Sequence, residues 1–141
     1  MHLDERMSDF IRQRRAYRQG RELPLKDLRI IDLSTVVAAP FAATLLGDFG
    51  AEVIKIENPT LPDATHAWGV LKGGIQPWWS VVSRNKLPVT LNLKAPEGAK
   101  IFADLVVKSD VLIENMRPGA LDRLGFTAEL TLQACFRMRM N

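Results

Sequence analysis

The chain has 141 residues, of which 47% are hydrophobic and 25% charged, and this length and composition suit one modest globular domain. Its single cysteine, Cys135, excludes an internal disulfide and a cysteine-based zinc site. No apolar run approaches the roughly 20 residues that cross a bilayer, and no signal-peptide pattern begins the chain, so a soluble, cytoplasmic protein without membrane contact is predicted. The net charge of +3 comes from the two ends, because residues 23–136 hold eleven basic and twelve acidic side chains, which argues against nucleic-acid binding.

Residues 1–22 are predicted to form a solvated leader arm with a weak helical stripe. Its six arginines would suit a mitochondrial transit peptide, but Asp4, Glu5 and Asp9 contradict the acid-poor composition of such peptides. The arm is therefore interpreted as solvated chain that precedes the domain.

A first strand–helix–strand unit is predicted directly after the arm. A branched, apolar strand at 28–33 is followed by a helix at 41–46, which Pro40 opens and Gly47 ends, and by a second strand at 51–56. Such a unit predicts two parallel strands joined by a right-handed crossover. The next segment, 57–80, interleaves prolines and glycines with three tryptophans and is predicted to be a long loop, which in a compact domain is usually functional.

A second unit is predicted from a strand at 88–93, a helix at 96–108 and a strand at 110–114. A short helix at 118–124 follows, with Gly125 as its cap. Two such units predict an α/β fold, a Rossmann-like, doubly wound, mostly parallel sheet.

Ligands of such a sheet bind outside the carboxyl ends of its strands. The loop at 34–40 contains no glycine where the dinucleotide fingerprint requires three, so NAD or FAD in the usual pose is not expected. Small residues at Ala38 and Ala39 still allow a ligand to approach the backbone, and a helix start favours an anion. Plain packing of helix against strand explains the same residues equally well.

Polar side chains follow the other strands. Lys55 and Glu57 end the second strand and share a face, while Arg117 and Arg123 follow the last one. A guanidinium donates two parallel hydrogen bonds to a phosphate, although single surface arginines are more often simply solvated.

Five segments taken together are more specific than any of these signals. They are LRIIDLS (28–34), APFAATLLGDFGAEVIKIE (39–57), NK (85–86), LNLKAPEG (91–98) and SDVLIENMRPGALDRLG (109–125). In this order and spacing they resemble the family III CoA-transferases, the group of formyl-CoA transferase, carnitine CoA-transferase and acyl-CoA racemase. The resemblance covers about residues 24–130, which we interpret as an N-terminal CoA-binding domain at 23–130.

The resemblance implies a function and partners. Family members move CoA between carboxylic acids through acid-anhydride and acyl-aspartyl intermediates, or act as racemases, and full-length relatives form homodimers of interlocked rings. CoA or an acyl-CoA thioester and a carboxylic acid would be substrates, with no separate cofactor and no metal. The CoA contacts that the resemblance implies are Val37, Ala38, Leu91, Asn92, Leu93, Lys94, Asn115, Met116, Arg117 and Arg123.

The sequence departs from the family at several positions. Asn58 stands where formyl-CoA transferase has an arginine, and Val37 stands where the family has a glutamine. None of Asp48, Asp63, Asp104 and Asp110 matches the catalytic aspartate, so no catalytic residue is assigned. Residues 131–141 show neither strand alternation nor a capped helix and are interpreted as a tail outside the family pattern.

Three functions stay open at this point. The chain could be a family member that binds CoA, a non-catalytic fragment that pairs with a homologous subunit, or a nucleotide-binding Rossmann protein of another kind. The loop at 34–40, which has no glycine, disfavours the third. The acyl donor and acceptor, and the choice between transferase and racemase, are not determined.

Overall fold

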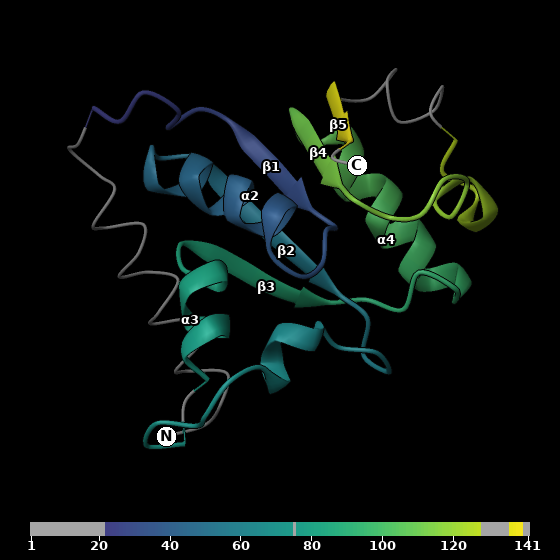
Figure 1. Ribbon diagram of the computed structural model, residues 1–141. Coiled ribbons are helices and arrows are strands. Elements are labelled where there is room, and N and C mark those ends of the chain that lie inside the picture. Colours follow the sequence, from purple (N-terminus) through teal and green to yellow (C-terminus); the bar gives the residue numbers. More distant parts are fainter. Residues whose placement is uncertain (1–21, 75, 128–135, 140–141) are drawn as a thin grey trace, which may run out of the picture.

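A computed structural model describes residues 22–74, 76–127 and 136–139 of the chain. Its elements in chain order are β1 (Arg29–Asp32), α2 (Ala38–Asp48), β2 (Glu52–Glu57), the 3₁₀ turn η1 (Ala64–Ala67), α3 (Pro77–Ser83), β3 (Lys86–Thr90), α4 (Pro96–Val107), β4 (Val111–Glu114), the 3₁₀ turn η2 (Asp122–Leu124) and β5 (Phe136–Arg139). Every strand pairing is parallel, and the order across the sheet is β3-β2-β1-β4-β5 (Figure 1). The predicted doubly wound α/β fold is confirmed.

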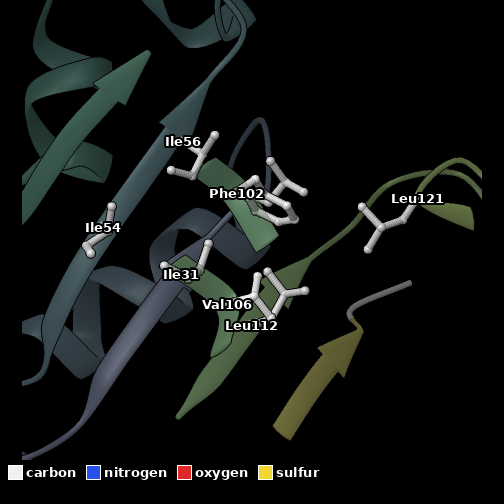
Figure 2. Close-up of a cluster of buried hydrophobic side chains, with 8 residues drawn as sticks. Ile31, Ile54, Ile56, Phe102, Val106, Leu112 and Leu121 are labelled. Atoms are coloured by element: carbon white, nitrogen blue, oxygen red, sulfur yellow. The ribbon is translucent and has the colours of Figure 1, made fainter. Parts of the chain in front are cut away.

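Alternating strand residues pack against helices on the two faces of the sheet. On one face, α4 contributes Phe102 and Val106 to a core with apolar residues of β1, β2 and β4, as Figure 2 shows. On the other face, Ala39 and Ala43 of α2 pack against Ile30 and its neighbours. The period of two along a strand sends successive side chains to opposite faces, which explains why these strands are apolar almost throughout.

The predicted helix at 41–46 begins earlier and ends later than expected. α2 starts at Ala38, so Pro40 is its third residue, where the helix offers no partner for an N–H and proline costs little. Gly47 does not end the helix but lies inside it and is buried against Asn85, with room for only a tight Cβ contact at 3.3 Å.

The predicted strand at 88–93 was placed too far along the chain. β3 runs from Lys86 to Thr90 and pairs with β2 so that Val53 lies opposite Lys86. Pro88 is tolerated because β3 is an edge strand of the sheet described here and needs no further partner on its outer side.

Three further assignments also need correction. The predicted loop at 57–80 contains η1 and the start of α3, and the predicted helix at 118–124 is only the short turn η2. Gly125 does end that turn in the left-handed conformation, with φ of 87°. The tail at 131–141 was expected to hold no strand, but β5 pairs with β4 over Val111 to Glu114.

In the described ranges, no helix is long and apolar enough to cross a membrane.

Candidate functional site

A pocket of about 210 Å³ opens at the carboxyl ends of the strands. It lies at the topological switch point, where the chain order in the sheet reverses between β1 and β4. Its walls come from the segments that follow β1, β2, β3 and β4. The lining residues are Leu33, Thr35, Lys55, Ile56, Glu57, Asn58, Leu61, Asp63, Leu93, Lys94, Met116 and Leu124.

Three of the ten predicted contact residues line this pocket: Leu93, Lys94 and Met116. The Lys94 backbone N–H donates to Asn92 Oδ1 at 3.1 Å, and the Met116 N–H donates to Glu114 Oε2 at 2.8 Å. Both segments that follow β3 and β4 are therefore fixed by side chains from their own strand ends.

The other seven predicted residues do not line the pocket. Val37 is the N-cap of α2 and Ala38 its first residue, directly after the turn that carries Thr35. Leu91 extends the pairing of β3, because its N–H donates to Glu57 O at 2.9 Å. Arg117 and Arg123 are exposed.

Asn115 holds a residue that lines the pocket. Its side chain accepts from Thr35 N at 2.8 Å and donates to Thr35 O at 2.9 Å, so it holds both polar groups of that backbone unit. Thr35 lines the pocket. The strand end of β4 thus supports the turn that follows β1.

The turn after β1 contains a strained residue. Val36 has φ of 71°, the left-handed region, which is unfavourable for a β-branched side chain and costs roughly 1–3 kcal/mol. Its N–H donates to Asp63 Oδ2 at 2.9 Å. Strain of this kind persists only where the surrounding contacts enforce it.

A buried cluster of charges lies beneath this turn. Asp32 is fully buried, and its carboxylate accepts from Lys86 Nζ at 2.7 Å and lies 3.6 Å from Lys55 Nζ. Lys86 also donates to Pro40 O at 2.6 Å, and Lys55 donates to Ser34 O. The cluster ties β1, β2 and β3 to the start of α2.

The Lys86 ammonium should make the free energy of unfolding depend on pH. Burial lowers the pKa of Lys86 below its usual 10.5, and the charge of Asp32 offsets this only in part. Between the two pKa values the unfolded chain binds more protons than the folded chain, so the free energy of unfolding should rise with pH across that window. Below the folded-state pKa, both states are protonated and the cost of burial is fully present.

We expect Lys86→Met to remove the rise in the free energy of unfolding with pH. Urea unfolding from neutral pH up to pH 10.5 measures it. Lys100→Met is the matched control, because Lys100 is an exposed lysine whose side chain is 81% accessible. The control should keep the rise of the parent chain. An unchanged rise in Lys86→Met would show that Lys86 does not titrate in this way.

A second polar cluster lies on the β2 side of the pocket. Glu57 Oε1 is 3.1 Å from His66 Nε2, and the His66 ring stacks on Trp79 with centroids 3.7 Å apart. The Asp63 N–H donates to the same Glu57 oxygen at 3.4 Å. Both carboxylates that line the pocket, Glu57 and Asp63, are thus engaged in hydrogen bonds.

Asp32, Asp63 and Thr35 belong to the site but were not predicted from the sequence. Asp32 and Lys55 did carry a signal, because a charged residue within an apolar strand must find a partner when the strand is buried. Asp63 lies in the segment predicted as loop, where nothing in the sequence distinguishes it from a solvated acid. Within the described part of the chain, no group of three or more His, Cys, Asp or Glu side chains could hold a metal ion.

Comparisons with known proteins identify the family to which this chain is similar. A protein in Chloroflexus aurantiacus described as succinyl-CoA–L-malate CoA-transferase beta subunit is 53% identical over 105 residues, which cover 73% of this chain and 26% of the relative. A human succinyl-CoA:glutarate CoA-transferase is 43% identical, covering 75% of this chain and 24% of its own length. An acetyl-CoA:oxalate CoA-transferase of Acetobacter aceti is 45% identical, and the match covers 75% of this chain and 27% of the relative. The chain spans about a quarter of the length of these relatives.

Solved structures with the same fold are also known. The crystal structure of a CAIB/BAIF family protein from Brucella suis superposes with a TM-score of 0.77 at 29% identity, over 84% of this chain and 33% of that one. The crystal structure of Rv3272 from Mycobacterium tuberculosis superposes with a TM-score of 0.74 at 28% identity, over 82% of this chain and 33% of that one. The family model described as CoA-transferase family III matches residues 25–135. The chain therefore belongs to CoA-transferase family III.

Proposed function

We propose that the pocket at the strand ends binds part of a coenzyme A molecule. The observation that carries the proposal is the position of the pocket at the switch point of a doubly wound sheet, in a chain of this family. The relatives from Chloroflexus aurantiacus, human and Acetobacter aceti are named as CoA-transferases, which supports CoA as the ligand.

The lining residues suit a ligand with an apolar body and anionic groups. Leu61, Leu93, Met116 and Leu124 supply apolar wall, and Lys94 supplies an exposed ammonium. A volume of about 210 Å³ is below the roughly 300–1,000 Å³ of pockets that enclose a drug-sized ligand, so only one portion of CoA fits inside.

The remainder of CoA would run along the rim of the pocket. The predicted contacts outside the lining come from the start of α2 and from the segments after β3 and β4, and in this proposal they form that rim. Arg117 and Arg123 are exposed and could meet phosphates, and the first turn of α2 offers backbone N–H groups and a favourable dipole. We therefore retain all ten predicted contacts as a proposal.

The transfer step is not assigned to any described residue. An acyl-aspartyl intermediate requires a carboxylate that is free to attack. Asp63 and Glu57 are the carboxylates that line the pocket, and both accept hydrogen bonds. We propose that this chain supplies the CoA-binding part and that transfer between carboxylic acids needs a further carboxylate.

The expected homodimer stays a prediction that sedimentation of the purified chain would test.

Titration calorimetry of the full chain with CoA tests the binding proposal. Lys94→Gln should weaken CoA binding by about five- to tenfold, the loss expected for one charge-assisted hydrogen bond at a partly solvated site. The matched control is Lys100→Gln, which changes an exposed lysine of α4 that makes an ion pair with Asp104. The control should bind CoA as the parent chain does.

Two results would count against the proposal. One is a parent chain that gives no heat with millimolar CoA and no rise in melting temperature, because a bound ligand must stabilise the folded state. The other is an equal loss of affinity in both lysine variants, which would indicate nonspecific attraction of an anion.

A further inference from the structure

We infer that Asp63 is a positioning residue: its carboxylate holds Val36 in the left-handed conformation and so sets the turn that leads from β1 into α2 at the pocket rim. The part of the inference that concerns CoA rests on the function proposed above. The part that concerns the turn stands on the geometry alone.

The conformation of Val36 is not one that its own side chain favours. Among the described residues, only Val36 and Asn85 have positive φ without being glycine, at 71° and 60°. Asparagine tolerates this region, whereas a β-branched valine does not. A contact from outside the turn must therefore maintain the conformation of Val36.

Asp63 supplies that contact from 27 residues further along the chain. The residue is 6% exposed, and its Oδ2 accepts from the Val36 N–H at 2.9 Å. Its other oxygen, Oδ1, accepts from Thr65 N at 2.9 Å and Thr65 Oγ1 at 2.7 Å. The bonds to Thr65 fix the orientation of the Asp63 carboxylate. Its Oδ2 is therefore held in place to accept from Val36.

The turn matters for the pocket because of its neighbours. Thr35 and Asp63 both line the pocket, and Val37 on the other side of Val36 is the N-cap of α2. A return of Val36 to negative φ would rotate the peptide units on both sides of it. The wall at Thr35 and the first turn of α2 would then no longer present the same groups to a ligand.

A double-mutant cycle on the full chain tests this inference. Asp63→Ser keeps one oxygen to cap Thr65 but leaves none for Val36. Without the clamp, Val36 should leave the left-handed region, and CoA affinity should fall by about tenfold. Adding Val36→Gly should restore affinity to within about threefold of the parent, because glycine adopts positive φ without a clamp.

Asn115→Ala is the matched control for the cycle. Asn115 also holds this turn, but it does so at Thr35, which is not among the residues with positive φ. Asn115→Ala should weaken CoA binding, and adding Val36→Gly should give no recovery. A purely structural role of Asp63 as the cap of η1 would likewise show no recovery with Val36→Gly.

NMR of the same variants reads the turn without a ligand. A positive φ at Val36 gives a strong cross-peak between its own amide and α protons, which should be present in the parent and weak in Asp63→Ser. If Asp63→Ser does not fold, Asp63→Thr, which also keeps one oxygen to cap Thr65 and leaves none for Val36, takes its place in the cycle.

The outcomes separate the two proposals. A cross-peak that stays strong in the Asp63 variant overturns the inference, as does a double variant that binds CoA no better than the Asp63 variant. If the parent chain binds no CoA, the proposed function fails, and the cross-peak alone then decides whether Asp63 positions Val36.

Discussion

Asp32→Ala is expected to lower the free energy of unfolding by about 3–5 kcal/mol, the loss seen when one partner of a buried ion pair is removed. The substitution would leave the ammonium groups of Lys55 and Lys86, at 3% and 1% side-chain exposure, without the carboxylate between them. It would also remove the acceptor that orders Ser34 N at 3.0 Å. Urea unfolding followed by circular dichroism measures the loss, which is a large share of the 5–15 kcal/mol typical of a domain.

The control is an aspartate that makes an ion pair in solvent. Asp104 lies 3.7 Å from Lys100 on α4, and its side chain is 63% exposed. Asp104→Ala should leave the unfolding midpoint unchanged, because exposed pairs contribute little. If Asp32→Ala and Asp104→Ala shift the midpoint equally, the buried cluster does not stabilise the fold as described.

Gly98→Ala should destabilise the chain by about 1–3 kcal/mol, although alanine is the better helix former. Gly98 is buried in the first turn of α4, and a Cβ there would overlap the carbonyl group of Asn92. Relief requires the backbone at 92–94 to move. Since Leu93 and Lys94 line the pocket, we also expect weaker CoA binding, measured on the same sample.

Gly47→Ala is the matched control for this substitution. Gly47 also lies inside a helix, but its nearest neighbours would be 3.3 Å from an added Cβ, a distance that small shifts can absorb. Its effect on the unfolding midpoint should be smaller and should not extend to the pocket residues, which belong to other segments. An effect on stability as large as that of Gly98→Ala would contradict the account of close approach at Asn92.

Much of the fold could be predicted from the sequence because its signals are local. Apolar runs of four to six residues alternate with segments that carry proline and glycine at their ends, and this pattern predicted β1, β2, α4 and β4 closely. The boundaries failed where a distant contact decided them. β3 begins at Lys86, which pairs with Val53 of β2 and whose side chain reaches Asp32 on β1, and no local pattern marks either contact.

The candidate site was predictable only in outline. The family resemblance implied Leu93, Lys94 and Met116, which line the pocket. The rule that ligands bind at the carboxyl ends of parallel strands pointed to Lys55 and Glu57, which also line it. It could not locate Asp63, because the segment at 57–80 lacks a periodic pattern. Its importance comes from a hydrogen bond to a residue 27 positions earlier.

The sequence by itself determined the α/β class, the family resemblance and the positions of most strand ends, since hydrophobic period, caps and motifs are properties of neighbouring residues. Only the tertiary structure decided which polar side chains meet, that β5 pairs with β4, and that Val36 is held at positive φ. These features depend on the order of strands in the sheet, which brings together residues that are far apart in the chain.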